Sequence, residues 1–362
     1  MVTVAEAFHR YLSSKRKDGI IGIEVETEVL NKRDYPAGVV EYLVDEDTGN
    51  PHWKVPESKY WEGVYDGSLR NYGVEYILKE PLSYLDALSA LDEFRTIFKD
   101  VPFLEKQPGT SVHVHLNFQN RTLCELAQFV TTFALVENLL TEFSGISRRS
   151  NLFARPHRVA ETQLDTNINM FKRVDRGEPT GFVLDEGMNK YAALNLASLS
   201  KLGTAEVRCF RGTTDTEEIK RWVTILNSVY KFALDLKSPK ELVSLYRHFG
   251  VDLVKNILGP SYPFRYTDGW ENLVRRNEYY MVRYANAIDD WSTFGSKYDG
   301  PKSRSKKKDS SGMLAPGTVD WAALDAVTID TFPAPVGVMQ PWGGTATISA
   351  IDDIDPQDDS EF

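Results

Sequence analysis

The chain has 362 residues, of which 42% are apolar and 12% aromatic, enough to fill the core of one large domain or two domains. Its formal net charge of −10 argues against a dedicated nucleic-acid binder. The two cysteines, Cys124 and Cys209, lie in apolar patterns, which indicates small buried side chains in a reducing compartment.

The first 18 residues carry scattered charges and no apolar core, so they do not resemble a secretory signal. No run approaches the roughly 18 apolar residues that a membrane-spanning helix needs. We therefore expect a cytoplasmic protein with no membrane partner. Thr3–Lys17 predicts a short amphipathic helix capped by Thr3.

Residues 19–30 alternate apolar and acidic side chains, which is typical of a strand. Glu24, Glu26 and Glu28 share one face, and three carboxylates there repel one another unless they reach water or a cation. For Glu28, near the strand end, we expect solvent. For Glu24 and Glu26, later strands of the same polarity favour a buried site.

Asp66-Gly67-Ser68 is a turn signal that predicts a pair of strands within residues 62–78. Glu75 stands among apolar residues of the second strand, either as a ligand or facing solvent. Residues 85–98 then show the apolar spacing of an amphipathic helix packed on the sheet.

Residues 111–117 alternate again, with His113, His115 and Asn117 on one face. Two imidazoles at this spacing favour a metal or phosphate site over an ordinary polar strand face. A long core helix follows at 123–143. The arginine-rich loop at 147–158 is either a solvated surface or a clamp for phosphate or carboxylate.

Residues 190–196 predict a strand with Asn195 on its polar side. In the next strand Thr204, Glu206 and Arg208 share a face, either as a simple ion pair or as a metal ligand beside a phosphate-neutralising guanidinium. Helical patterns occupy 219–233 and, as an aromatic cap, about 239–298.

From residue 300 the chain carries ten acids and five bases, with a basic run at 302–308 and six acids in 351–362. This composition predicts a largely disordered tail at 299–362, either mobile or an arm for a protein partner. Residues 1–298 then form the catalytic domain.

The chain lacks both common glycine-rich phosphate loops and any zinc-like Cys/His spacing. The remaining candidates are carboxylates with one or two imidazoles, which suit Mg²⁺ or Mn²⁺ better than a soft metal.

Five blocks in this order resemble the putative amidoligase family, a branch of the glutamine synthetase and glutamate–cysteine ligase superfamily. They span about residues 19–235. The blocks are Gly22-Ile-Glu-Val-Glu26, Asp66-Gly-Ser-Leu with Gly73-Val-Glu-Tyr76, Val112-His-Val-His-Leu116, Leu194-Asn-Leu196, and Ala205-Glu-Val-Arg208 with Phe210-Arg-Gly-Thr-Thr-Asp215.

The resemblance implies an α+β fold, a glutamine-synthetase-like curved antiparallel sheet (a partial barrel) with helices on its outer face and metal-bound ATP on its acidic face. The implied metal ligands are Glu24, Glu26, Glu75, His113, Glu206 and Asp66. The implied nucleotide contacts are His115, Arg208, Asn117 and Asn195. The implied catalytic residues are Arg208, His115 and Arg211.

The resemblance also implies ATP- and Mg²⁺-dependent (or Mn²⁺-dependent) amide ligation, in which a substrate carboxylate becomes an acyl phosphate that an amine attacks. The substrates would be small molecules or peptides bearing a carboxylate and an amine. Two alternatives stay open: a non-catalytic binding or assembly protein on the same barrel, and a guanidino-kinase-like phosphotransferase.

Overall fold

The structure is a computed structural model. It describes residues 2–8, 18–35, 38–44, 51–105, 107, 109–149, 151–152, 154–157, 159, 161–178, 189–264, 267 and 269–298. The chain divides into two units, Met1–Arg304 and Ser305–Phe362, and the described residues all belong to the first. The tail expected at 299–362 lies outside the described residues, so the domain boundary and the tail's partner stay predictions.

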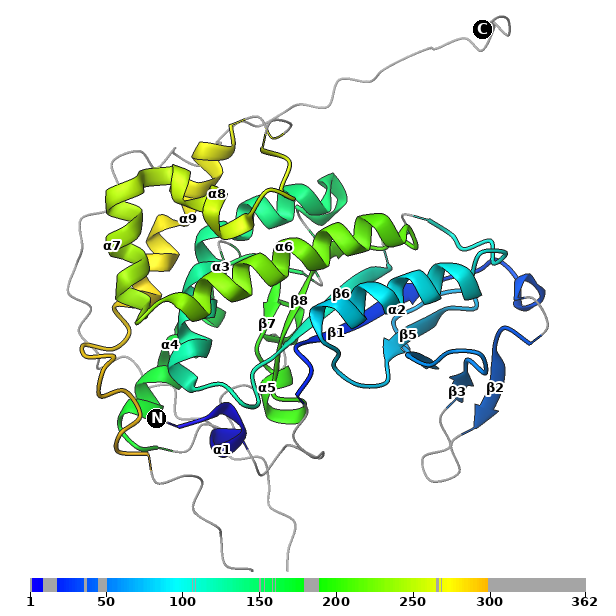
Figure 1. Cartoon of the computed structure of the whole chain (residues 1–362), viewed down its shortest axis with the longest axis horizontal. Coiled ribbons are helices and arrows are strands. Elements are labelled where there is room, and N and C mark those ends of the chain that lie inside the picture. The colour runs from blue at the N-terminus through cyan, green and yellow to red at the C-terminus, as the bar shows by residue number, and fades with distance from the viewer. Residues whose placement is uncertain are drawn as a thin grey trace, which may run out of the picture. The chain divides into compact units, whose positions relative to one another are not determined.

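The described strands form one antiparallel sheet in the order β2-β3-β4-β5-β1-β6-β8-β7, with β2 and β7 at its edges. Figure 1 shows β1 in the middle of the sheet, between β5 and β6. The strands are β1 (Ile21–Thr27), β2 (Glu41–Val44), β3 (Pro51–Lys54), β4 (Trp61–Val64), β5 (Val74–Leu78), β6 (Ser111–Asn117), β7 (Leu194–Asn195) and β8 (Thr204–Arg211).

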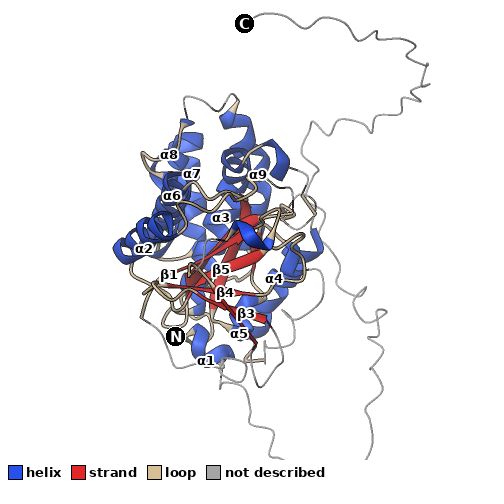
Figure 2. Cartoon of the chain, turned by 90° about the vertical axis from the view of Figure 1, so that its right-hand side faces the viewer, coloured by secondary structure: helices blue, strands red, loops and turns tan. Residues whose placement is uncertain are grey.

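Helices cover the apolar face of this sheet, with α2, α3 and α6 packed against it and α7, α8 and α9 packed beyond them (Figures 1 and 2). The α-helices are α1 (Val4–Phe8), α2 (Tyr84–Ile97), α3 (Leu123–Ser144), α4 (Glu161–Asp175), α5 (Ser198–Lys201), α6 (Thr216–Asp235), α7 (Pro239–Phe249), α8 (Leu253–Leu258) and α9 (Trp270–Ala285). Short 3-10 turns are η1 (Lys32–Asp34), η2 (Ile146–Arg148), η3 (Asn189–Tyr191) and η4 (Gly250–Asp252).

Strand alternation decides which face of the sheet becomes core. In β1, Ile21, Ile23 and Val25 are buried under the helices. In the β8 region Phe210 stacks on Trp222 of α6, with ring centroids 4.8 Å apart. The opposite face of the central strands is therefore left for polar side chains.

The helix α3 begins with a capping box, in which Thr122 and Glu125 satisfy each other's backbone N–H groups. Among the described residues it alone is long and apolar enough to cross a membrane, contrary to the expectation from the sequence. However, 94% of its most apolar 18-residue window is buried inside the fold, so the packing of the core accounts for its apolarity.

Most predicted elements are present, and Cys124 and Cys209 are buried and free, as expected. The helix expected at 3–17 is described only as α1, and residues 9–17 lie outside the described set.

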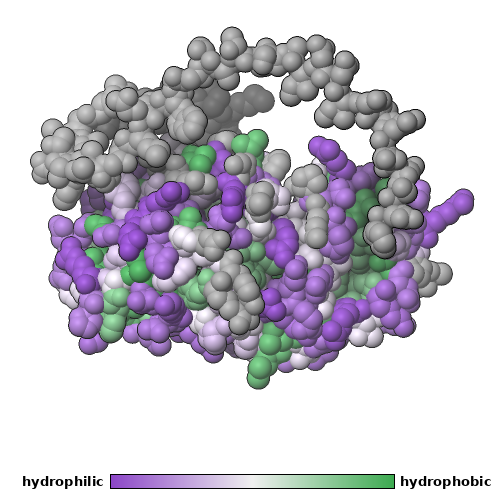
Figure 3. Space-filling view, turned by 90° about the horizontal axis from the view of Figure 1, so that it is seen from above, coloured by the Kyte–Doolittle hydropathy of each residue, from purple (hydrophilic) through white to green (hydrophobic). Residues whose placement is uncertain are grey.

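The face seen in Figure 3 is mostly hydrophilic with separate hydrophobic patches. The fold is thus a mixed α/β fold with an open antiparallel sheet, which agrees with the coarser part of the expected fold class.

Candidate functional site

Glu24 and Glu26 lie at the centre of the polar face because β1 runs between β5 and β6. In the sheet register Glu26 is opposite Glu75 of β5, and Glu24 is opposite His113 of β6. Directly opposed residues of antiparallel strands point to the same face with neighbouring Cβ atoms. The register therefore brings carboxylates from two strands and an imidazole from a third to one place.

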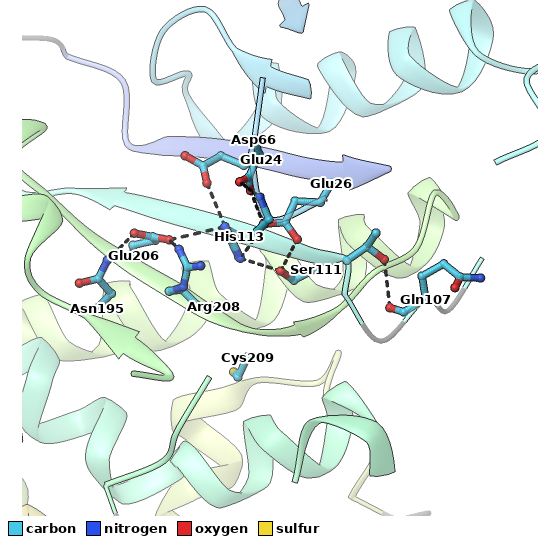
Figure 4. Close-up of polar contacts among 12 residues, drawn as sticks. Glu24, Glu26, Asp66, Gln107, Ser111, His113, Asn195, Glu206, Arg208 and Cys209 are labelled. Atoms are coloured by element: carbon cyan, nitrogen blue, oxygen red, sulfur yellow. Dashed lines mark hydrogen bonds and ion pairs between the residues drawn. The ribbon is translucent and has the colours of Figure 1, made fainter. Parts of the chain in front are cut away.

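The neighbouring strands β8 and β7 add to Glu24, Glu26, Glu75 and His113, and we call the resulting polar face of the sheet the polar wall. Glu206 of β8 is opposite both His115 of β6 and Asn195 of β7. Figure 4 shows Glu206, Asn195 and Arg208 converging beside the β1 carboxylates. Residues far apart in sequence thus share one surface through strand pairing alone.

His113 is the most connected group of the site and is only 2% exposed. Its Nδ1 lies 2.9 Å from Glu24 Oε2 and 3.5 Å from Glu206 Oε1. Its Nε2 lies 2.7 Å from Ser111 Oγ and 3.7 Å from Glu26 Oε1. One buried imidazole therefore contacts acids from both β1 and β8.

His115 contacts the second carboxylate oxygen of Glu24. Its Nε2 lies 2.9 Å from Glu24 Oε1, and its Nδ1 lies 2.8 Å from Thr204 Oγ1. Burial lowers the pKa of His115, but the negative charges of Glu24 and Glu206 outweigh it and raise that pKa to about 8. At neutral pH the imidazole is therefore mostly cationic.

Burial alone would raise the pKa of Glu24, but the imidazoles of His115 and His113 hold it well below its usual range. Glu206 forms an ion pair with Arg208 and accepts a 2.7 Å hydrogen bond from Asn195 Nδ2. These two carboxylates therefore already have cationic or hydrogen-bonding partners.

Glu75 is in the opposite situation. Burial and the negative charges of Glu24, Glu26 and Asp66 raise its pKa to about 10. Asp66 reaches this place from the β4–β5 turn, where Ser68 N and Oγ each donate to it at 2.8 Å. Without a cation, Glu75 is therefore protonated at neutral pH.

Three overlapping groups of side chains could each hold a metal ion, with ligand atoms within 4.8 Å of one another. The donors are carboxylate oxygens and imidazole nitrogens, the set expected for Mg²⁺ or Mn²⁺. The crowded acids around Glu75 also fit a cation, since a positive charge there would remove the repulsion. The groups are Glu24, Glu75 and His113; Glu24, His115 and Glu206; and Glu26, Asp66 and Glu75.

The family comparison covers the strands that build this wall. A family model described as putative amidoligase enzyme matches residues 21–230, more than half of the chain. The chain belongs to this family. A search of curated proteins gave no match.

Two of the residues expected in the site, Arg211 and Asn117, are placed differently from the rest. Arg211 Nη2 lies 2.7 Å from Glu218 Oε1 of α6, and its Nη1 donates to Phe143 O, so it is not among the converging groups. The Asn117 amide donates to Gly19 O and accepts from Gln119 N at the strand end. Asn195 does reach the wall, where it holds Glu206.

A register shift between β6 and β8 falls at Arg208 and Cys209. Val112 pairs with Phe210 and Val114 with Val207, so Arg208 and Cys209 together oppose His113. This is a β-bulge, which re-aims side chains on the strand that carries the extra residue. Arg208 points into the site, and Cys209 lies toward the helices (Figure 4).

One side chain of the arginine loop, Arg148, has a structural role. Arg148 is buried, and its guanidinium donates to the carbonyls of Arg208 at 2.9 Å, Cys209 at 3.3 Å and Thr110 at 3.5 Å. It thereby fixes the bulge. Arg149 pairs with Glu142, and position 158 lies outside the described residues.

Reasoning from the sequence missed two contributors. Ser111 bonds to both Glu26 and His113, and its place two residues before His113 was the available signal. Glu28, expected to face solvent, is 3% exposed and accepts hydrogen bonds from Arg70 N at 2.8 Å and Asn71 Nδ2 at 3.0 Å. It holds the turn that carries Asp66.

Proposed function

We propose that this protein is an ATP- and Mg²⁺-dependent (or Mn²⁺-dependent) carboxylate–amine ligase that works through an acyl phosphate, on an amino acid or peptide. Family membership supports amide-bond formation in general. The observation that carries the finer proposal is the convergence of Glu24, Glu75, His113 and Glu206 with Arg208 on one sheet face. A glutamine-synthetase-like fold is part of the same proposal.

The cation ligands in this proposal are the three overlapping acid and imidazole groups of the wall. Bound divalent cations would neutralise the phosphate oxygens of ATP and polarise its terminal phosphoryl group. The chain itself contributes the alignment, because every ligand except Asp66 of the β4–β5 turn stands on a hydrogen-bonded strand. Such preorganised charge is the main contribution that a protein makes to phosphoryl transfer.

Arg208 and His115 are the proposed contacts for transferring phosphate. The charges of Glu206, Glu26 and Glu24 outweigh the effect of burial and raise the pKa of Arg208, so its guanidinium stays cationic. His115 is mostly protonated at neutral pH for the same reason. Both groups are largely buried, which strengthens their attraction for an anion and keeps water from the acyl phosphate.

Release of ADP and phosphate from ATP and Mg²⁺, measured with a panel of carboxylates and amines, tests the proposal. A ligase requires both substrates together for full turnover. Glu24→Gln is expected to lower turnover by about 10³-fold while leaving the far-UV circular dichroism unchanged. The matched control is Glu41→Gln on the exposed edge strand β2, which should keep full turnover.

The results separate ligation from the alternatives. Nucleotide binding without turnover would favour a binding or assembly protein. Phosphorylated amine or guanidine as the final product would favour a phosphotransferase. Full turnover in Glu24→Gln would refute the assignment of the site.

A further inference from the structure

Arg148 contacts the stretch of β8 that carries Arg208, although the two residues are 60 positions apart in the sequence. It is 3% exposed, and its guanidinium donates to the carbonyl oxygens of Arg208 at 2.9 Å, Cys209 at 3.3 Å and Thr110 at 3.5 Å. The first two carbonyls belong to the bulged residues of β8, and the third lies just before β6. In the described part of the chain, the hydrogen bonds of this guanidinium thus all go to backbone carbonyls.

The core of the protein determines where Arg148 lies. It is the last residue of η2, which follows α3 and packs against both α3 and β8. Gly145 ends α3 with a φ of 98°, a conformation that a residue with a side chain rarely adopts, and its carbonyl accepts from Arg148 N at 3.0 Å. The guanidinium therefore reaches β8 from a buried turn that the main core helix supports.

The bulged backbone of β8 needs hydrogen-bond donors from outside the strand ladder. A β-bulge disrupts the ladder locally, and a buried carbonyl that lacks a donor is destabilising. The planar guanidinium fork of Arg148 serves both bulge carbonyls at once, which the point charge of a lysine ammonium cannot match in geometry. Arg148 therefore favours the backbone conformation in which these two carbonyls face it.

The same backbone directs the side chain of Arg208. Its Nη1 forms an ion pair with Glu206 in the polar wall, whereas its Nε has no hydrogen-bond partner among the described residues (Figure 4). A guanidinium has several N–H donors, so Arg208 keeps donors for a further acceptor such as a phosphate oxygen. Their direction depends on the backbone of residue 208, whose carbonyl Arg148 holds.

We propose that Arg148 is a positioning residue for Arg208, which holds the bulge through its carbonyls and thereby aims the Arg208 guanidinium at a phosphate group. Arg148 touches no phosphate in this role and acts through the backbone alone. The inference rests on the part of the proposed function that makes Arg208 a phosphate contact.

The wild type tests this coupling without any turnover. In the full-length protein labelled with ¹⁵N-arginine, the buried Nε–H groups give ¹H–¹⁵N signals, and Arg148→Lys and Arg208→Lys identify two of them by their loss. Addition of Mg²⁺ and ADP should move both signals, because the backbone of Arg208 is the acceptor for Arg148. A shift of neither signal, or of the Arg208 signal alone, would overturn the inference.

Nucleotide affinity in variants gives the second readout, measured by isothermal titration calorimetry with ADP and saturating Mg²⁺. Arg148→Lys keeps the positive charge but loses the planar fork, and it should weaken ADP binding about 10-fold, since small displacements of a positioned group are costly. The Arg208 Nε–H signal should also move in this variant before any nucleotide is added. Arg149→Lys is the matched control, because the adjacent Arg149 is half exposed and pairs with Glu142.

The outcomes distinguish this inference from the proposed function. Full ADP affinity with an unmoved Arg208 signal in Arg148→Lys would overturn the role of Arg148, even in a protein that proves to be a ligase. If both readouts depend on Arg148 but no carboxylate and amine are joined, the inference stands and the proposed function fails. The two signals of the wild type decide the case if Arg148→Lys does not fold, since Arg208→Lys and the remaining arginine signals still identify them.

Discussion

The two ends of the polar wall share one sheet face but differ in how their charges are balanced. At the acid end, Glu26, Asp66 and Glu75 cluster, and burial with repulsion raises the pKa of Glu75 to about 10. At the mixed end, Glu24 and Glu206 contact imidazoles and Arg208 at ion-pair distance.

On the proposed function, this difference predicts which part of the site would depend on a bound cation. The mixed end is nearly neutral by itself, because its acids are matched by cations from β6 and β8. The acid end stays protonated or strained until a positive charge arrives. On the proposed function, a balanced half therefore lies beside a half that a bound cation would complete.

The largest effect on turnover in this comparison is expected from a substitution at the mixed end. Arg208→Gln should lower turnover by about 10²–10³-fold, since one preorganised donor to a developing charge is removed. Arg211→Gln is the matched control, because Arg211 lies three residues away and pairs with Glu218 instead. Steady-state ADP release measures both variants, and equal losses would place Arg208 outside the chemistry.

The next effect concerns how a bound cation changes the melting temperature through the acid end. Saturating Mg²⁺ or Mn²⁺ should raise the melting temperature of the wild type by about 5 °C, through preferential binding to the folded state. Glu75→Gln should melt a few degrees higher than the wild type in EDTA at pH 8 and gain less from the cation. Differential scanning calorimetry checks both. A wild-type protein indifferent to cations contradicts this picture of the acid end.

The pH dependence of the metal-free protein separates the two ends further. His115 has its pKa raised from 6.5 to about 8, so its stabilising contribution is full below pH 6.5 and is lost as pH rises through 8. The raised pKa of Glu75 acts in the same direction, from about 4.5 to about 10. The lowered pKa of Glu24 acts oppositely, with stability lost as pH falls below its usual range.

We therefore expect the melting temperature in EDTA to fall between pH 6.5 and 8, and His115→Gln to flatten that part of the curve. A wild-type melting temperature that rises over this interval would reverse the sign and reject the assignment of charge to His115.

The smallest effect concerns the support of the acid end. Glu28→Gln weakens the hydrogen bonds to Arg70 N and Asn71 and should cost about 1–2 kcal/mol of unfolding free energy. Because Glu28 fixes the turn that carries Asp66, Mn²⁺ affinity should fall a few-fold. Urea unfolding and Mn²⁺ titration measure these changes. An unchanged Mn²⁺ affinity would show that the turn keeps its conformation without the hydrogen bonds of Glu28.

Simple alternation along the strands predicted much of this arrangement. It placed Glu24, Glu26, His113, His115 and Glu206 on a polar side before any pairing was known, because period-two patterns record which face is buried.

What alternation could not supply were departures from regularity and the partners of single side chains. The bulge opposite His113 puts Phe210 on the apolar face, whereas strict alternation would have placed it with Glu206 and Arg208, and no local pattern marks this shift. The burial of Glu28 and Arg148 depends on segments distant in sequence. The alternation of β6 also places Ser111 on the polar side with His113, but a serine there does not by itself indicate a functional site.

The bulge also decides which face of β8 the residues after it occupy. One additional residue allows β8 to present a guanidinium on one side and, two positions later, the aromatic ring that stacks on Trp222 on the other. Without the bulge, strict alternation along β8 would send Phe210 toward the polar wall and Arg211 into the hydrocarbon interior. Deleting Cys209 should therefore preserve these faces, because Phe210 and Arg211 would still oppose Val112 and Ser111 in a regular ladder.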